Sequence, residues 1–348
     1  MTGLASPGLR VMQVMAGAPH GGAEAFFSRL VPALAGAGLD QRVVIRRDPG
    51  RAALLRAAGI EPVELRFGGW LDPWTGMAMR REIERYRPRI VLSWMSRATR
   101  FVPKGEFVHI GRLGGYYDLK YYRRCHHLIA NTQNVADYLR ERGWPSERLH
   151  LARNFAATAI AAPVARQWLG TPAHAPVLLA LGRLHRNKAF DVLIAAMAQV
   201  PGAFLWLAGE GDERAELETL AASFGIADRL RFLGWCDDTG ALYAAADIVV
   251  VPAREEPLGN VVIEAWARDR PVIAAASRGP AELITSEENG LLVPVEDSVG
   301  LAAALRRLIG DADLRRRLAV GGRAAYEGAF TEGAAVRRYL DLFQRLAA

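Results

Sequence analysis

A chain of 348 residues is long enough for two domains, and its 51% content of hydrophobic residues is that of an ordinary soluble globular protein. No stretch reaches the ~18 uninterrupted apolar residues of a membrane span, and the first apolar run is broken by Pro7, Arg10 and Gln13, so neither a transmembrane helix nor a secretory signal is predicted. Cys125 and Cys236 lie far apart without metal-type spacing, which argues against a disulfide framework or a zinc site. We therefore expect a cytoplasmic protein.

The net charge of +7 is unevenly distributed along the chain. Residues 1–165 hold 24 lysines and arginines against 13 acidic residues, whereas residues 166–348 hold 20 against 24. A basic first half suits an anionic partner, either a membrane surface or nucleic acid. The alternative is that arginine is simply abundant in this composition.

Short apolar runs alternate with longer segments of helical periodicity, which is typical of β-α-β crossovers and a parallel sheet. The predicted strands of the first half are 9–17, 41–47, 88–94, 106–113 and 127–131. Those of the second half are 176–184, 203–210, 229–235, 246–253, 270–276 and 290–295. The Ala- and Pro-containing stretch 154–176 predicts a linker, so each half is predicted to be a doubly wound α/β domain.

The last segment predicts an amphipathic helix after Thr331, which needs a packing partner. Its apolar face is formed by Val336, Tyr339, Leu340 and Phe343.

The loops that follow the strands are the expected ligand sites of an open parallel sheet. In the first of them, Gly21 and Gly22 lie between strand and helix, where the missing side chains let the backbone approach a ligand. The loop matches neither GxxxxGK[ST] nor GxGxxG, so a P-loop NTPase and a simple dinucleotide-binding fingerprint are both disfavoured.

A second loop, within "LGRLHRNKAFDVL" (181–193), carries Arg183 at the end of a predicted strand and Lys188 at the start of the next helix. Two cations in one crevice suit a diphosphate and would stabilise the charge that grows on it as a leaving group. The alternative is two solvated loop cations.

A third loop, "REEPLGNVVIEAWARDRPVIA", follows the strand 246–253. Glu256 lies in the loop, the amides of Gly259 and Asn260 begin the next helix, and these free N–H groups favour an anion. Glu264 is surrounded by apolar residues of that helix, so its carboxylate needs hydrogen-bond partners such as two neighbouring sugar hydroxyls. The alternative is a carboxylate that only complements the helix N-terminus.

Two stretches of the first half combine aromatic and cationic residues, "WLDPWTGMAMRREIERYRPR" (70–89) and "YYDLKYYRRCHH" (116–127). This combination is typical of a membrane interface or of a groove for a sugar chain or nucleic acid. The alternative is core tyrosines beside solvated arginines. The Asp-Ala-Asp stretch at 311–313 predicts a helix N-cap better than a metal site, and no metal site is predicted.

Together these motifs resemble the retaining nucleotide-sugar glycosyltransferases of GT-B architecture, specifically the family 4 group that builds bacterial lipopolysaccharide, capsule and glycolipid. The resemblance is strongest over 176–300, through "GRLHRNKAFDVLIAA", "LAGEG", "RFLGW" and the E-x7-E pair Glu256 and Glu264. It continues more weakly through "GGAE" (21–24) and 128–154. The order and spacing of several motifs make it specific, which E-x7-E alone would not be.

The resemblance implies two Rossmann-like domains that face a central cleft: 1–165 on the acceptor side and 166–330 for the donor, with a helix in 331–348 that crosses back to the first domain. It implies transfer of a sugar from a nucleoside diphosphate sugar to a saccharide or lipid-linked acceptor, with retention and with no cofactor or obligatory metal. The expected place is the cytoplasm, at the anionic inner membrane surface, with no nucleic acid as partner.

The resemblance also implies roles for individual residues. Glu256 would hold donor-sugar hydroxyls, Glu264 the ribose, and Arg183 and Lys188 the diphosphate; the catalytic residues are Arg183, Lys188 and Glu256. Further donor contacts are expected at Gly21, Gly22, Glu210, Trp235, Leu258, Gly259 and Asn260, and acceptor contacts at Arg112, Tyr116, Tyr117 and Lys120.

The chain departs from the family pattern in its first half. Gly114 stands where many relatives carry a histidine near the donor's hydroxymethyl group, and His109 is interpreted as a core histidine. Ala189 and Phe155 replace common glycines. Two alternatives therefore stay open, a catalytically silent sugar-nucleotide-binding partner and a GT-B sugar-nucleotide epimerase. A nucleic-acid-binding protein is a remote third, suggested only by the basic charge.

Overall fold

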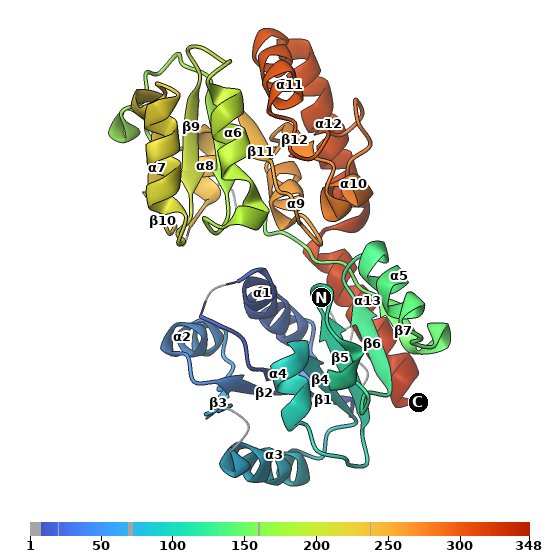
Figure 1. Ribbon diagram of the computed structural model, residues 1–348. Coiled ribbons are helices and arrows are strands. Elements are labelled where there is room, and N and C mark those ends of the chain that lie inside the picture. The colour runs from blue at the N-terminus through green and yellow to red at the C-terminus, as the bar shows by residue number, and fades with distance from the viewer. Residues whose placement is uncertain (1–7, 20, 69–71, 159–160, 237) are drawn as a thin grey trace. The chain divides into compact units, whose positions relative to one another are not determined.

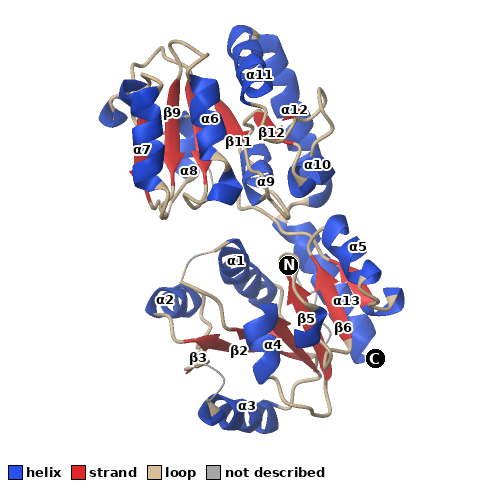
Figure 2. Cartoon of the chain, viewed as in Figure 1, coloured by secondary structure: helices blue, strands red, loops and turns tan. Residues whose placement is uncertain are grey.

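The computed structural model describes residues 8–19, 21–68, 72–158, 161–236 and 238–348. The chain divides into two compact units, Met1–Phe155 with Glu332–Ala348, and Ala156–Thr331, each built around a parallel sheet with helices on both faces (Figures 1 and 2). The boundary follows Phe155 and not residue 165. The reason is that Val164 N–H donates to Ala241 O at 3.1 Å, and Arg166 binds Asp247 at 3.0 Å, so this part of the predicted linker belongs to the second unit.

The first unit holds a seven-stranded parallel sheet in the order β3-β2-β1-β4-β5-β6-β7 within the described residues. The strands are β1 Arg10–Met15, β2 Asp40–Arg46, β3 Val63–Leu65, β4 Ile90–Trp94, β5 Val108–Leu113, β6 His127–Ala130 and β7 Leu149–Leu151. The strand order reverses between β1 and β4, which is where open parallel sheets bind ligands. Strands β3 and β7, of three residues each, were not predicted.

Helices α1, α2 and α13 bury their apolar sides on one face of this sheet, and α3, α4 and α5 cover the other. Their bounds are α1 Gly22–Gly36, α2 Pro49–Ala57, α3 Pro73–Tyr86, α4 Met95–Phe101, α5 Gln133–Glu141 and α13 Glu332–Ala347. The apolar face predicted for the last helix is buried, and α13 packs against α1 inside the first unit.

The second unit holds a six-stranded parallel sheet in the order β10-β9-β8-β11-β12-β13 within the described residues. The strands are β8 Val177–Leu181, β9 Phe204–Ala208, β10 Leu230–Gly234, β11 Ile248–Val251, β12 Val272–Ala275 and β13 Leu291–Val293. The predicted strands are confirmed in both units.

Helices α6, α7 and α11 pack on one face of the second sheet, α8 and α9 on the other, and α12 contributes to both cores. Their bounds are α6 Phe190–Met197, α7 Arg214–Ser223, α8 Gly240–Ala245, α9 Asn260–Trp266, α11 Ser298–Gly310 and α12 Ala312–Ala329, with the short α10 Arg278–Leu283 after β12. Asp311 caps α12 by accepting the Leu314 N–H at 2.8 Å, as its predicted capping role required.

The loops after β8 and β9 touch through their backbones. A Cβ at Gly209 would lie 1.9 Å from the carbonyl O of Gly182, and Gly209 has φ +146, so only glycine fits there. Leu184 N–H donates to Glu210 O at 2.8 Å a little further on. These contacts place the loops that carry Arg183 and Glu210 next to each other. Among the described helices none is long and apolar enough to cross a membrane.

Candidate active site

The predicted donor-side residues come together at the carboxyl edge of the second sheet. Lys188 ends a 3₁₀ turn (Arg186–Lys188) after β8, and Glu256 lies in the loop between β11 and α9. Strands β8 and β11 are neighbours, so their loops emerge side by side. The spacing of these residues in the sequence therefore becomes proximity in space.

Lys188 and Glu256 form a part-buried ion pair. Lys188 Nζ lies 2.5 Å from Glu256 Oε2, while the other carboxylate oxygen accepts the Gly259 N–H at 3.1 Å and faces the Leu258 N–H at 3.5 Å. The carboxylate thus bridges the cation and the start of α9. On ligand binding the carboxylate can accept hydrogen bonds from hydroxyl groups, while the Lys188 ammonium can donate to phosphate oxygens.

Glu264 has the hydrogen-bond partner that its apolar surroundings called for. Its Oε2 accepts the hydroxyl of Tyr243 at 3.1 Å, and Tyr243 is buried on α8. Arg268 lies over the Tyr243 ring at 4.9 Å and donates to the Glu264 carbonyl at 3.1 Å. Tyr243 was not predicted; the signal for it was a carboxylate among apolar residues, since a second element had to supply a donor.

Other predicted donor contacts are exposed at the loop ends of the same edge. Arg183 is exposed and makes no hydrogen bond or ion pair with the described residues. Glu210 is also exposed, and the Trp235 side chain after β10 is 48% exposed. These side chains are accessible to a ligand at this edge.

The first loop of the first unit is held from beneath by two buried charged side chains. Glu24 accepts the Ala18 N–H at 2.9 Å, and Arg51 donates to the carbonyl of Ala18 at 2.6 Å. A Cβ at Gly21 would lie 2.3 Å from Glu24 Oε2, so this glycine makes room for the carboxylate. Gly21 and Gly22 are exposed. Glu24 and Arg51 were not predicted as site residues, although Glu24 belongs to the "GGAE" motif.

The predicted acceptor contact of Arg112 is not supported, because the Arg112 side chain is buried. It is only 1% exposed, donates to the Tyr339 hydroxyl at 2.7 Å and to Asn154 Oδ1 at 2.5 Å, and lies over the rings of Phe26 and Trp94. Its guanidinium therefore ties α13 to the sheet.

The other predicted acceptor residues divide into two kinds. Tyr116 packs edge-on against Tyr138 with ring centroids 5.2 Å apart, and burial raises the pKa of Tyr117. Lys120 has a 54% exposed side chain, paired with Asp118 at 2.8 Å. Of these three residues, only Lys120 is exposed. The two tyrosines are partly buried and pack against the apolar residues between α5 and the sheet.

His109 is a core histidine, as expected. It contacts Ser93 Oγ at 2.8 Å through Nε2, and burial lowers its pKa to about 4. Within the described ranges no three His, Cys, Asp or Glu side chains are grouped to hold a metal ion.

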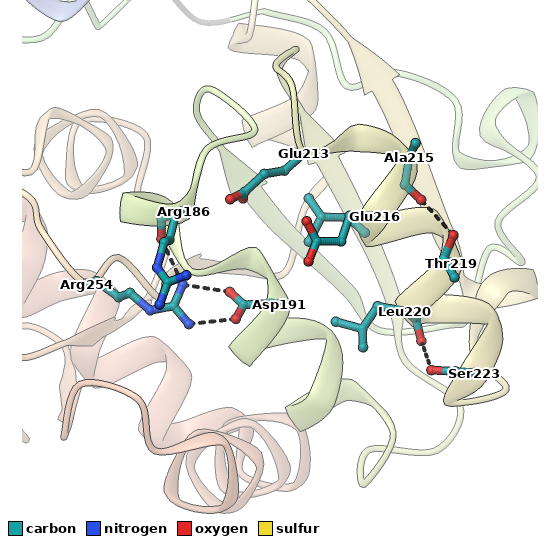
Figure 3. A pocket seen from close by; sticks show the side chains of 10 residues that line it. Arg186, Asp191, Glu213, Ala215, Glu216, Thr219, Leu220, Ser223 and Arg254 are labelled. Carbon is teal, nitrogen blue, oxygen red and sulfur yellow. Dashed lines mark hydrogen bonds and ion pairs between the residues drawn. The ribbon is translucent and has the colours of Figure 1, made fainter.

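A cavity of ≈ 610 Å³ opens between α6 and α7 (Figure 3). These helices pack on the opposite face of the second sheet from α9, which carries Glu264. Arg186, Asp191 and Arg254 form one wall, and Glu213 and Glu216 of the α7 region lie opposite. The predicted site residues do not belong to the described residues that line it. It is a separate feature on the back of the loops that carry Lys188 and Glu256.

Both halves of the chain match families of known proteins. Residues 175–311 match the family "Glycosyl transferases group 1" and residues 20–159 match "Glycosyltransferase Family 4". The lipopolysaccharide core biosynthesis glycosyltransferases LpsE and LpsD of Rhizobium meliloti (strain 1021) are similar along nearly their full length. LpsE is 38% identical, over 92% of this chain and 95% of its own, and LpsD 39%, over 97% and 98%.

Solved structures share the fold. Anabaena Alr3699/HepE, solved in complex with UDP and glucose, superposes with a TM-score of 0.84 at 22% identity, covering 97% of this chain and 99% of its own. Sucrose-phosphate synthase from Thermosynechococcus elongatus gives 0.82 at 25% identity, with the same coverage. The chain is therefore a glycosyltransferase of family 4 with the GT-B fold.

Proposed function

We propose that the protein is a retaining glycosyltransferase that moves a sugar from a nucleoside diphosphate sugar to a saccharide or lipid-linked acceptor in lipopolysaccharide core synthesis. The observation that carries this proposal is the Lys188–Glu256 pair beside the Gly259 amide, at the carboxyl edge of a Rossmann-like sheet. One group suits a phosphate, the other suits sugar hydroxyls, and they are 2.5 Å apart. A sugar phosphate carries phosphate oxygens and hydroxyls a few bonds apart, so neighbouring residues of these two kinds can bind one such ligand in place of each other.

The proposed reaction uses the charges of this edge. Lys188 and Arg183 neutralise the diphosphate, so the bond between the anomeric carbon and the phosphate oxygen can break with the electron pair on that oxygen. The acceptor hydroxyl bonds to the anomeric carbon from the same face and gives its proton to the departing phosphate. Glu256 holds the sugar in place. Glu264, oriented by Tyr243, holds the ribose.

The acceptor class is supported by the relatives. LpsE and LpsD, whose names place them in lipopolysaccharide core biosynthesis, match nearly the whole chain. We extend that role to this protein and place it at the cytoplasmic face of the inner membrane.

Contact with that membrane surface is supported by helix α3 of the basic first unit. Trp74 is 67% exposed and Met77 44% exposed, and Arg80 and Arg81 are exposed one turn further on. An interfacial aromatic next to arginines suits an anionic lipid surface. Trp70, part of the same predicted stretch, lies outside the described residues.

A catalytically silent sugar-nucleotide-binding partner is the second candidate, and Gly114 favours it. Among the described residues a Cβ there would meet Ala23 Cβ at 3.6 Å and Arg112 Nη1 at 4.0 Å, which are ordinary contacts, so packing does not require a glycine at this position. Turnover of the donor distinguishes an enzyme from this candidate. A free sugar nucleotide with an inverted centre would instead identify an epimerase.

Binding of the donor class is tested by thermal unfolding with excess UDP, GDP, ADP or CMP. Ligand at about 100 times its dissociation constant adds ~2.7 kcal/mol of stability, which raises the melting temperature by several degrees. We expect one nucleoside diphosphate to stabilise the wild type. If none does, the assignment of Arg183 and Lys188 to a diphosphate is contradicted.

A further inference from the structure

The two loops that carry the proposed catalytic cation and carboxylate run side by side in register. Arg254 Nη1 donates to the carbonyl O of Arg186 at 2.8 Å. One residue along, Glu255 N–H donates to Asn187 O at 3.2 Å, and Asn187 Nδ2 donates to Glu255 Oε2 at 2.9 Å. The next contact of this series is the Lys188–Glu256 pair itself. The contacts of Arg254 with Arg186 and of Glu255 with Asn187 therefore determine where Glu256 meets Lys188.

Arg254 joins its loop to three other segments at once. Its two terminal nitrogens grip the Asp191 carboxylate at 2.8 and 2.6 Å, and Nη2 also donates to Glu296 at 2.9 Å, with Nε on the second oxygen of that carboxylate. Asp191 lies in the first turn of α6 and Glu296 follows β13. Figure 3 shows the guanidinium directed at Asp191 with Arg186 beside it. Only a planar fork can serve these partners together; a lysine cannot.

The ion pairs of Arg254 matter more for the conformation of the loops than for the stability of the fold. Asp191 and Glu296 have side chains 42% and 54% exposed, and ion pairs to such groups add little to folding free energy. Ala189, directly after Lys188, has φ +53, a left-handed conformation that persists where the surroundings hold it. The loop after β8 is thus held in a conformation that it would not keep alone.

We propose that Arg254 is a positioning residue for sugar transfer: its guanidinium, anchored by Asp191 and Glu296, fixes the β11 loop against the β8 loop, so that Glu256 and Lys188 face one donor. The role in transfer rests on the proposed function. The holding of the loops does not, because it concerns the ligand-free protein.

The first test compares Arg254→Lys, which keeps the charge but loses the fork, with Arg307→Lys as a matched control. Arg307 on α11 also grips a carboxylate, that of Glu287, away from these loops. Hydrogen exchange without ligand reports on the amides of Glu255 and Gly259. We expect exchange at both to rise about tenfold in Arg254→Lys and to stay unchanged in the control. Unchanged protection in Arg254→Lys overturns the proposal.

The second test is steady-state kinetics with the nucleotide sugar that the wild type turns over. We expect kcat of Arg254→Lys to fall at least ~10-fold while the donor KM stays within about threefold, because the cations remain and their alignment is lost. A kcat that falls only in proportion to the folded fraction overturns the positioning role. A wild type without turnover contradicts the proposed function and with it the role in transfer, while the exchange result still decides whether Arg254 holds the loops.

Discussion

At the scale of single residues, Lys188 is the group whose proposed role is most specific. Its ammonium meets Glu256 in the ligand-free protein and would meet the diphosphate in the complex. The pair is part-buried, with side chains 29% and 14% exposed, and Glu256 keeps the Gly259 N–H, so removing the lysine should cost only about 1 kcal/mol of folding stability. Ligand affinity is therefore the sensitive measure of this residue.

Lys188→Ala should weaken the binding of the preferred nucleoside diphosphate at least ~10-fold, because a charge-assisted contact to phosphate is lost. The free nucleoside, which has no phosphate, should bind both proteins alike. Isothermal titration with each ligand measures the difference. Equal losses for diphosphate and nucleoside would place Lys188 away from the phosphates.

The Tyr243–Glu264 hydrogen bond predicts a coupling energy. Because a buried hydroxyl donates to a carboxylate, Tyr243→Phe and Glu264→Gln should each destabilise the protein, and the double variant should lose ~1–2 kcal/mol less than the sum. Urea unfolding of the four proteins measures this cycle. Additive losses would mean that the bond contributes nothing in solution.

Single residues were predictable from the sequence where the strand order implies their neighbours, and not where their partners come from distant segments. Lys188 and Glu256 were predictable because loops after neighbouring parallel strands must lie together. Arg112 was assigned to the acceptor and is buried, because its partner Tyr339 lies 227 residues further along and nothing local announces the contact. Arg254 passed unnoticed for the same reason, since its anchors come from α6 and the loop after β13.

At the scale of elements, the close approach of the β8 and β9 loops makes Gly209 critical. In Gly209→Ala the new Cβ would lie 1.9 Å from Gly182 O, so the loops must separate. We expect a loss above ~2 kcal/mol in unfolding free energy and weakened nucleotide binding.

The matched control for this prediction is Gly202→Ala. Gly202 also has positive φ (+76), but a Cβ there meets none of the described residues within 4 Å, so only the backbone strain of about 1 kcal/mol applies. Chemical denaturation compares the two variants. Similar losses would show that the backbone contact between the loops has no energetic weight.

Elements were predictable where the pattern was long. The alternation of apolar runs and helical segments located the longer strands, and α13 was visible from its apolar stripe. Helix α4 begins directly at the end of β4, through Met95 at φ +60, with no loop between them, so no turn residues mark its start in the sequence. The three-residue strands β3 and β7 gave no periodic signal, whereas β13, equally short, lies within the apolar run 290–295 and was predicted.

At the scale of the whole molecule, the basic first unit predicts salt-dependent binding to anionic vesicles through α3. Each arginine near such a surface contributes about 1 kcal/mol, so Arg81→Glu should lower partitioning into phosphatidylglycerol-containing vesicles several-fold, and Trp74→Ser should lower it too. Trp168→Ser is the control, since Trp168 is 80% exposed but belongs to the second unit. Co-sedimentation with the vesicles measures the bound fraction. If Trp168→Ser lowers that fraction as much as the α3 variants do, α3 is not the membrane-binding surface.

The central claim, retaining transfer from a nucleoside diphosphate sugar, is tested most directly by NMR of the product formed on a truncated lipopolysaccharide core. The purified wild type and Glu256→Gln are given the nucleotide sugar whose diphosphate stabilises the fold. We predict a new glycosidic bond with the anomeric configuration of the donor in the wild type, and a rate at least ~100-fold lower in Glu256→Gln. A product of inverted configuration, or equal rates for the two proteins, would contradict it.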